Sequence, residues 1–285
     1  MSDDVNAILP QADQMSRRYA RAIIEFTTAV IHTGSVEEVL WLLTDDIVSD
    51  LGFEDCVVYI LDESRGKLIQ KAAYGNKKAG PSEILDPIEI DLGQGITGRC
   101  AIEQQPILVN DVTTDPSYVV DDIQRMSELA VPILSQGKTI GVIDSEHSEK
   151  EFYTSQHLAT LRALSAIITT KYENTSALRE LKASEARLRH LANHDSLCGL
   201  PNRHCFVTEL SEAAERFSEG KLTTLCVLIM DLDRFKVIND SYGHAAGDQL
   251  IVRVSERLRS LLPESVLLAR LSGDEFAVLS TNASD

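Results

Sequence analysis

The feature that most constrains the fold is a run of six apolar residues, Leu225–Met230, that ends in an acidic residue, Asp231. An uninterrupted apolar run of this length is typical of a central β-strand buried on both faces of a sheet. Two further predicted strands, 266–271 and 276–280, are joined by a turn at 272–275 and form a hairpin. If these strands are neighbours in one sheet, Asp231 and the acidic residues of the turn converge at one end of it.

Acidic residues gathered at the end of a sheet predict a site for a divalent cation. Mg²⁺ is usually held by one or two carboxylates, with phosphate oxygens completing its shell. Lys236 lies in the turn after Asp231, where its ammonium group can neutralise a phosphate, and Gly273 lets the backbone approach a ligand closely. The alternative is that Asp274 and Glu275 are ordinary solvated turn residues.

Four segments occur here in a fixed order: HDSLCGLPNR at 194–203, MDLDRFKVINDSYGHAAGD at 230–248, Arg270, and SGDEF at 272–276. With these segments, residues 194–280 resemble the GGDEF family, the diguanylate cyclases. The resemblance implies a palm-type nucleotide cyclase fold. It also implies that two GTP molecules condense to cyclic di-GMP and two pyrophosphates, each 3′-hydroxyl attacking the α-phosphate of the GTP held by the other subunit.

The same resemblance gives roles to individual residues of this sequence. Two carboxylates and a backbone carbonyl would hold Mg²⁺, with Mn²⁺ as a substitute, while other side chains position the nucleotide. The metal-binding residues would be Asp231, Asp274 and, through its carbonyl, Leu232. The catalytic acids would be Glu275, near the attacking hydroxyl, and Asp274. The substrate-binding residues would be Asn239 and Asp248 at the guanine edge, Lys236 at the phosphates, and Gly273 in the turn.

The sequence departs from the family pattern at three places. Ser272 replaces the first glycine of the signature, which is tolerated if the backbone φ there is negative. Residues 263–266 carry neither the Arg nor the Asp of the product-inhibition motif RxxD, so feedback inhibition through that site is predicted to be absent. The chain ends at Asp285, soon after the hairpin. We therefore expect 194–285 to be the N-terminal part of a cyclase domain, inactive as it stands.

The region before residue 172 predicts an α+β unit with an antiparallel sheet between helices. Residues 15–50 and 152–172 have helical periodicity, and a short helix is predicted at 95–104. The predicted strands are 56–61, 67–73, 106–109, 129–134 and 138–145, and residues 75–95 predict loops. The stretches DLGQGITGRCAIEQQPILVNDVTTDPSY and SELAVPILSQGKTIGVIDSEHSEKEFY resemble a GAF domain over about 17–170. Such domains bind many small molecules or only dimerise, so the implied ligand is an unidentified small molecule.

Candidate contacts for that ligand lie on the loop and helix that cover the pocket of GAF domains. These residues are Tyr118, Asp121, Asp122 and Met126.

Two specific activities of GAF domains are not expected in this chain. Bilin attachment requires a cysteine with an adjacent histidine, which neither Cys56 nor Cys100 has. Free methionine sulfoxide reductases use a cluster of cysteines, and Cys100 alone cannot form the disulfide. His147 follows Asp144 and Glu146, but an exposed turn between strand and helix is favoured over a metal site.

The charge of the chain narrows its partners and its location. The formal net charge of −17 argues against a general binder of nucleic acid or anionic membrane, because both need a basic face. No apolar run approaches the ~18–20 residues of a membrane span, and the first residues are acidic where a signal peptide is basic. Five cysteines without a CxxC pair indicate reduced thiols. We therefore expect a cytoplasmic protein that binds neither nucleic acid nor membrane.

The segment between the two regions, 172–193, contains no glycine or proline and predicts a helix. Its leucines fall near a heptad seam, which is broken by a glutamate at one inward position. They are Leu178, Leu181, Leu188 and Leu191. The segment is either a solvated connecting helix or a parallel two-stranded coiled coil that would make the protein a homodimer.

The predicted organisation is therefore a tail at 1–16, a GAF sensor domain at 17–171, a helical linker at 172–193 and part of a GGDEF domain at 194–285. The function it predicts is a sensor that controls a diguanylate cyclase. The alternative is a non-catalytic GAF module for ligand binding or dimerisation, whose GGDEF remnant binds GTP or acts as a scaffold for a downstream domain.

Overall fold

The computed structural model describes the backbone of residues 3–283 and the side chains of 17–49 and 51–282. The chain forms two compact units, residues 1–178 and residues 179–285. The division falls inside the segment predicted as a linker. Within the described residues, no helix has the length and apolar character needed to cross a membrane.

The N-terminal unit is built on a six-stranded antiparallel sheet with the strand order β5-β2-β1-β8-β7-β6. β1 (Cys56–Asp62) and β2 (Lys67–Tyr74) form one hairpin, and β7 (Ser127–Ser135) and β8 (Lys138–His147) form another. The short strands β5 (Glu89–Asp91) and β6 (Ile107–Val109) are the edges. The predicted α+β class with an antiparallel sheet is confirmed.

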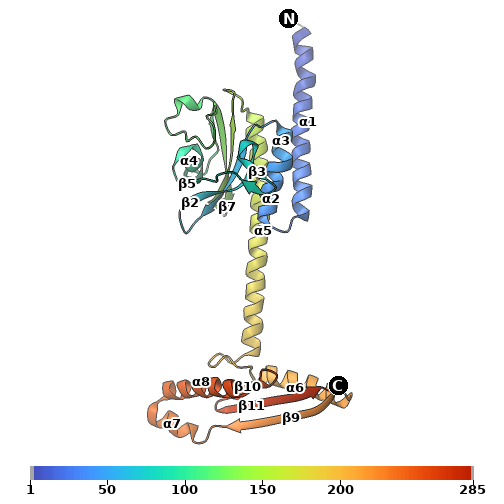
Figure 1. Ribbon diagram of the computed structural model, residues 1–285, viewed down its shortest axis with the longest axis vertical. Helices are drawn as coiled ribbons and strands as arrows, with labels where there is room; N and C mark the ends of the chain where they lie inside the picture. Colours follow the sequence, from blue (N-terminus) through green and yellow to red (C-terminus); the bar gives the residue numbers. More distant parts are fainter. Residues whose placement is uncertain (1–2, 284–285) are drawn as a thin grey trace. The chain divides into compact units, whose positions relative to one another are not determined.

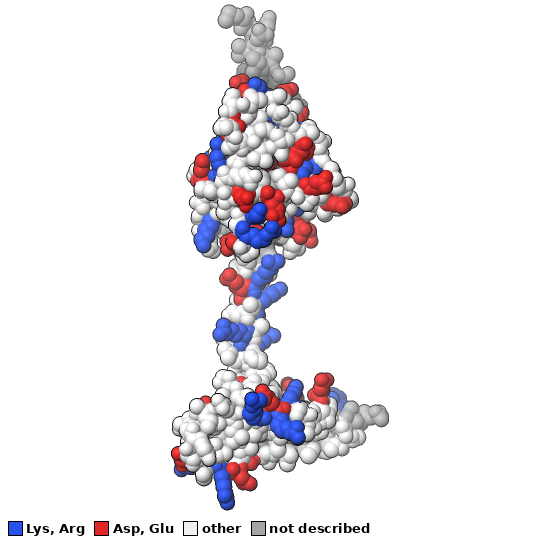
Figure 2. All heavy atoms as spheres, turned by 60° about the vertical axis from the view of Figure 1, so that its left-hand side comes forward, with Lys and Arg blue, Asp and Glu red and all other residues white. Residues whose placement is uncertain are grey.

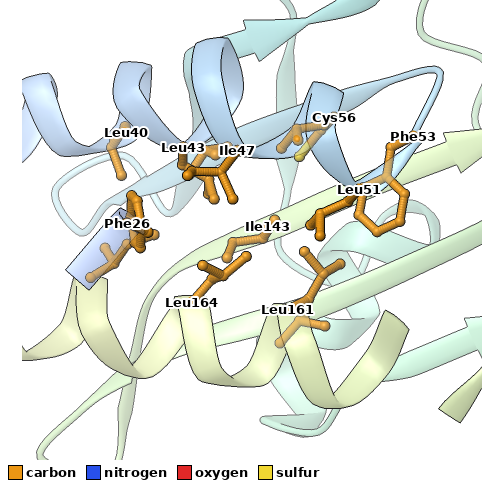
Figure 3. Packing of buried hydrophobic residues seen from close by; sticks show 14 of the residues in the cluster. Phe26, Leu40, Leu43, Ile47, Leu51, Phe53, Cys56, Ile143, Leu161 and Leu164 are labelled. Atoms are coloured by element: carbon orange, nitrogen blue, oxygen red, sulfur yellow. The ribbon is translucent and has the colours of Figure 1, made fainter. Parts of the chain in front are cut away.

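One face of this sheet is covered by helices from both ends of the unit (Figure 1). Before β1 come α1 (Asp3–His32), α2 (Val36–Leu42), the π-helical turn η1 (Leu43–Ile47) and α3 (Val48–Leu51); α5 (Ser155–Asn193) follows β8. Their apolar side chains meet those of the strands in the larger of two cores. Phe26, Leu164 and Ile143 pack together there, fully buried (Figure 3).

The first helices differ from the prediction at two points. α1 begins at Asp3, so most of the predicted tail at 1–16 is helical, and residues 1–2 lie outside the described part. The helical stretch predicted over 15–50 is broken before Val36. The Ser35 side chain accepts a hydrogen bond from the Glu38 amide, an N-cap that starts a new helix.

The opposite face of the sheet is covered by α4 (Gly95–Glu103) and by loops. The predicted loop of 75–95 contains short secondary-structure elements: the 3₁₀ turn η2 (Gly75–Lys77) and the two strands β3 (Lys78–Gly80) and β4 (Glu83–Ile84). A second 3₁₀ turn, η3 (Val112–Thr114), follows β6. Gly98 lets α4 lie against the loop after β5, because a Cβ there would stand 2.5 Å from the Asp91 carbonyl oxygen. The smaller apolar core lies beneath α4.

α5 is one continuous helix of 39 residues that contains both the predicted helix of 152–172 and the predicted linker. Up to Ile168 it contributes buried side chains to the larger core. Beyond that point its leucines are exposed, with Leu181 at 65% and Leu188 at 64%. The segment is helical as expected, and the coiled coil stays a prediction.

The C-terminal unit has a three-stranded antiparallel sheet with the order β10-β11-β9. Its elements are α6 (Arg203–Ser218), β9 (Leu222–Asp231), α7 (Phe235–Tyr242), α8 (His244–Leu261), β10 (Leu267–Ser272) and β11 (Glu275–Ala283). Phe206 of α6 and Ile251 of α8 are buried against the sheet in two separate clusters. The predicted hairpin is confirmed.

One prediction for this unit is wrong. The run 225–230 is not a central strand buried on both faces: β9 is an edge of the sheet, and Leu228 and Ile229 are 52% and 63% exposed. Within the described residues β11 is the only strand that pairs with β9, which leaves its other edge open. α8 begins at His244 behind Gly243, so Asp248 lies in its second turn.

Candidate functional site

The register of the C-terminal sheet brings the predicted acidic residues together. Asp231, the last residue of β9, stands directly opposite Glu275, the first residue of β11. Asp274 lies beside Glu275 in the tight turn, where Gly273 has a φ of 48°. Ser272, at the position of the family's first glycine, keeps a negative φ and donates a hydrogen bond to Glu275 Oε2 at 2.9 Å. The serine is therefore accommodated without backbone strain.

The carboxylates of this group interact unfavourably with one another. The pKa of Asp231 is raised by loss of hydration and by the negative charges of Asp274, Glu275 and Asp233. Clustered carboxylates of one sign attract a counter-charge, and a hard divalent cation matches their oxygen ligands. The donor chemistry of this end of the sheet therefore fits Mg²⁺.

An ion pair fixes the hairpin to the beginning of the unit. Arg270 donates to the Gly273 carbonyl oxygen from Nε at 2.9 Å and from Nη2 at 2.7 Å, and its Nη1 lies 2.9 Å from Asp195 Oδ1. Partial burial opposes ionisation of Asp195, but hydrogen bonds from Cys198 and the Arg270 guanidinium hold its pKa below the ordinary value. The motif that begins at 194 thus positions the acidic turn.

A second group of predicted residues lies where α7 meets α8. Asn239 Oδ1 is buried and has no hydrogen-bond partner among the described residues. A Cβ added at Gly247 would lie only 1.9 Å from that oxygen, which is a severe steric overlap. Only glycine therefore fits at position 247 while the Asn239 side chain keeps this conformation. Asp248 follows on the exposed side of α8. An unsatisfied amide beside an exposed carboxylate suits a polar ligand with both donors and acceptors, such as a guanine edge.

The turn between β9 and α7 contains the remaining predicted residues. The Leu232 carbonyl accepts a hydrogen bond from the Phe235 amide at 3.2 Å and retains a second lone pair. Arg234 adopts a left-handed conformation at the start of α7, and Lys236 is exposed. Among the described residues no group of three or more His, Cys, Asp or Glu side chains is arranged to hold a metal ion unaided. Two carboxylates and one carbonyl leave positions that phosphate oxygens would have to fill.

Comparison with known proteins identifies both regions. The family model for the diguanylate cyclase GGDEF domain matches residues 192–285, and that for the GAF domain matches residues 33–170. The chain is a GAF domain followed by a GGDEF domain.

Individual relatives agree with this assignment. The diguanylate cyclase TpbB of Pseudomonas aeruginosa is 54% identical over 99 residues, which cover 35% of this chain and 22% of TpbB. The chain thus spans about a fifth of that relative's length. A GAF domain from a phosphoenolpyruvate-protein phosphotransferase of Coxiella burnetii superposes with a TM-score of 0.52 at 18% identity, covering 58% of this chain and 98% of that one. A free methionine-R-sulfoxide reductase of Neisseria meningitidis gives 0.51 at 19% identity, covering 56% and 91%. Both likenesses show the fold alone.

The candidate ligand contacts of the GAF domain are largely occupied by partners within the domain. Asp121 pairs with the buried Lys77 at 2.7 Å, and Asp122 lies 3.4 Å from the Arg125 guanidinium. The Tyr118 hydroxyl accepts a hydrogen bond from the Arg125 amide at 3.0 Å. Met126 is half-buried and its amide donates to the His147 carbonyl oxygen. Two of the four, Asp121 and Asp122, are therefore paired with the buried cations Lys77 and Arg125.

The prediction for His147 is wrong. It lies in β8, not in an exposed turn, and is buried against Phe152 with ring centroids 3.5 Å apart. Its Nε2 is 3.6 Å from Glu54. Strand β8 extends two residues beyond the predicted end because its last residues pair with the start of β7.

Sequence reasoning missed a set of buried acids in the GAF domain. Asp55, Glu128, Asp144 and Glu146 are each at most 6% exposed. Two strands carry three of them, at positions that alternate with residues of the opposite face. The signal was present in SELAVP and IDSEH, where acids occupy inward positions of apolar strands, but acids are seldom buried without a partner.

Proposed function

We propose that the GGDEF domain binds GTP with Mg²⁺ and serves cyclic di-GMP signalling as a diguanylate cyclase under control of the GAF domain. The observation that carries this proposal is the register that sets Asp231 opposite Glu275, beside Asp274. Together with the 54% identity to a diguanylate cyclase over 99 residues, it supports nucleotide chemistry over a solvated turn.

The chain's own residues would divide the work as follows. Asp231, Asp274 and the Leu232 carbonyl would hold Mg²⁺, which when bound neutralises phosphate charge. Asn239 and Asp248 would hold the guanine edge, the carboxylate accepting from its N–H groups. Lys236 would bind a phosphate.

Two further residues would act at the reacting end. Glu275 would orient the attacking 3′-hydroxyl and accept its proton. Gly273 would leave room for the nucleotide phosphates, because nothing lies within 4 Å of the position where its Cβ would be.

Each site holds one GTP, whereas the reaction joins two. Condensation therefore requires two copies of the domain facing each other, independently of any sequence pattern. The exposed leucines of α5 provide an apolar stripe for pairing the copies. A change in the GAF domain would alter how the two copies pair.

The nucleotide site is tested by isothermal titration of the chain with a non-hydrolysable GTP analogue and Mg²⁺. We expect binding that requires Mg²⁺ and falls more than about 100-fold in Asp274→Asn, since even outer partners of a metal are worth 10–100-fold. Asp240→Asn, an exposed acid on α7, is the matched control. Equal binding by the Asp274 variant and the wild type would remove the assignment.

A second candidate function is a GTP-binding module without turnover that regulates a partner domain. It is favoured by Asn239, whose unsatisfied oxygen suits nucleotide recognition whether or not reaction follows. A product assay separates the two functions. Cyclic di-GMP formed by a protein that also binds the analogue supports the cyclase, and binding without product supports the module.

A further inference from the structure

A buried histidine near the beginning of α5 connects that helix to α1. His157 is 4% exposed, and so is Tyr19 of α1, which lies 138 residues earlier in the chain. The Tyr19 hydroxyl oxygen is 2.5 Å from His157 Nε2. α1 and α5 both lie on the same face of the sheet (Figure 1). This hydrogen bond therefore joins the two helices at a point without access to water.

The other ring nitrogen of His157 caps the beginning of α5. Thr154 directly precedes the helix. Its amide donates to His157 Nδ1 at 3.1 Å, and the His157 amide donates to Thr154 Oγ1 at 3.4 Å. This reciprocal pair has the geometry of a capping box, in which Glu or Gln usually occupies the third helical position. A histidine in that position makes the cap depend on the protonation state of its ring.

The two contacts of the ring define its protonation state. Because Nδ1 accepts from an amide, the ring is neutral and its proton is on Nε2, which donates to the Tyr19 hydroxyl oxygen. Protonation of Nδ1 would set a ring N–H against the N–H of Thr154, so the charged ring would have to move. Since the imidazole is rigid, that movement also displaces Nε2 from Tyr19. One proton therefore disturbs both contacts.

The surroundings of His157 do not balance a positive charge. Phe152 stacks on the imidazole with ring centroids 5.0 Å apart, and the rings of Phe53, Tyr153 and Tyr19 meet it edge to face. Charged side chains are spread over the surface of the domain (Figure 2), but none of the described Asp and Glu residues forms an ion pair with His157. A charge in these surroundings loses hydration without gaining a partner.

A second histidine stacks on the same phenylalanine. The rings of His147 and Phe152 have centroids 3.5 Å apart. Nδ1 of His147 also accepts from a backbone amide, that of Glu149 at 3.0 Å, and its Nε2 lies 3.6 Å from Glu54 Oε1. Burial lowers the pKa of His157 and a charge on His147 lowers it further, which outweighs the Phe152 carbonyl that raises it. His147 thus tunes the protonation of its neighbour.

We propose that His157 is a pH switch: its neutral ring holds α1 against the capped start of α5, and protonation breaks both contacts. In acid the turn of α1 around Tyr19 then detaches and the first turn of α5 frays. The same helix α5 continues to Asn193. The switch does not depend on nucleotide binding, because all of its residues belong to the N-terminal unit.

The direction of the effect follows from the pKa of His157. The unfolded chain takes up this proton at about pH 6.5, whereas the pKa is lowered in the folded domain. The stability that the neutral ring provides is therefore complete above about pH 6.5 and is lost as pH falls through the lowered pKa. The buried acids of this domain act in the opposite direction, because their pKa values are raised, so they do not imitate this loss.

The other ionisable groups around the ring keep their charge in the same range. The pKa values of Tyr19 and Tyr153 are raised by burial, so both hydroxyls stay protonated. Arg18, whose charge acts on Tyr19, stays positive. Glu54 stays ionised, because hydrogen bonds from Ser148 hold its pKa below the ordinary value against the effect of burial. Among these groups, a change between about pH 7 and about pH 5 is left to the two histidines.

The switch is tested on the whole chain by hydrogen exchange of the α1 amides at about pH 7 and about pH 5, corrected for the intrinsic effect of pH on exchange. We expect peptides covering 17–25 to exchange about threefold or more faster at the lower pH, the effect of losing one hydrogen bond. The end of α1 is an internal control, because a different contact holds it: the Lys171 ammonium donates to the Thr33 carbonyl oxygen at 2.6 Å. Its protection should not change.

Substitutions separate the switch from a structural histidine. His157→Gln removes the titration and keeps a residue suited to the capping box, so exchange of 17–25 should be equal at both pH values. Tyr19→Phe removes the partner on α1, so exchange should be fast at both. His32→Gln, an exposed histidine at the end of α1, is the matched control and should respond as the wild type does. An acid response of the same size in His157→Gln and in the wild type would overturn the proposal.

Magnetic resonance of isotope-labelled histidine follows the ring itself and requires no variant. At about pH 7 the proton of His157 should be on Nε2, and its titration should have the same midpoint as the change in α1 exchange. His147→Gln should move that midpoint to higher pH, because a charge that opposes protonation is removed. A proton on Nδ1, no titration before the domain unfolds, or titration without a change in α1 would each show a structural histidine and refute the switch.

Discussion

The chain carries two clusters of carboxylates in opposite environments. In the GGDEF domain, Asp231 and its neighbours lie at the end of a sheet in contact with water. The pKa of Asp231 is raised there, by loss of hydration and by the neighbouring negative charges. In the GAF domain the carboxylates are inside the fold, and the pKa of Glu146 rises to about 9. The difference teaches that the environment decides the chemistry of a carboxylate: the exposed cluster suits a metal with its phosphates, whereas burial favours the protonated form of the acids inside the GAF domain.

The largest expected effect is that of pH on the GAF domain. The pKa values of Asp55, Glu128, Asp144 and Glu146 are raised in the fold, to about 7, 8 and 9 for Asp55, Glu128 and Glu146. The folded state therefore binds more protons than the unfolded state. The stability this provides is complete below the unfolded pKa values and is lost as pH rises through 7–9.

Calorimetry should accordingly show the melting temperature of the GAF domain falling by about 5 °C or more between pH 5.5 and pH 9. The double variant Glu128→Gln/Asp144→Asn should flatten this dependence. If the melting temperature were the same at both pH values, the buried acids would not have raised pKa values, and the difference drawn between the two clusters would be wrong.

The next largest effect is expected from Arg270→Ala. It removes two hydrogen bonds to the Gly273 carbonyl and leaves Asp195 without its cation. The free energy of unfolding of the GGDEF domain should fall by about 2 kcal/mol, measured by urea denaturation. Adding Asp195→Asn, which removes the charge but keeps an oxygen for the amides of Leu197 and Cys198, should cost little more if the two side chains act as a pair. Additive losses would mean that the hairpin is held by other contacts.

Gly247→Ala is expected to change the free energy of unfolding less than Arg270→Ala does, but to weaken binding of the GTP analogue. The new methyl group displaces the Asn239 side chain, while alanine favours the helix by up to ~1 kcal/mol over glycine, so the net stability change should be within about 1 kcal/mol. Affinity for the GTP analogue should fall about tenfold, the worth of one hydrogen bond. Ala245→Ser, exposed in the same helix, should change neither quantity. An unchanged affinity would exclude Asn239 from guanine recognition.

The smallest effect on the single chain is expected from Leu188→Ala. The side chain is 64% exposed, so unfolding of the monomer should change by less than about 0.5 kcal/mol. Analytical ultracentrifugation should nonetheless show weaker self-association, because a leucine of the seam is lost. If association is unaffected, the copies do not pair through α5.

The outline of both domains could be predicted from the sequence, because it depends on local periodicity. The β1–β2 and β10–β11 hairpins and α4 lie where alternation and turn residues indicate, and the meeting of Asp231 with Glu275 follows from strands that are neighbours. What could not be predicted depends on neighbours that a local pattern does not specify. An apolar run such as 225–230 reads the same at the centre and at the edge of a sheet.

The same limit explains the acids and the asparagine. Glu128 and Glu146 were missed because their burial depends on which strand pairs with which, and His147 because β8 runs on where β7 supplies a partner. Asn239 could be named from the family resemblance. Its contact with Gly247 follows only from the packing of α7 on α8.

The unbroken course of α5 has a consequence for protein engineering. Each residue added to an α-helix turns everything after it by about 100°. One extra alanine after Ser184 would therefore rotate Leu188 a quarter of a turn or more away from the row it shares with Leu181, whereas seven extra residues would restore that row to within about 20°. The number of residues in this helix therefore fixes the direction in which its later side chains point, and insertions of graded length would measure how self-association depends on that direction.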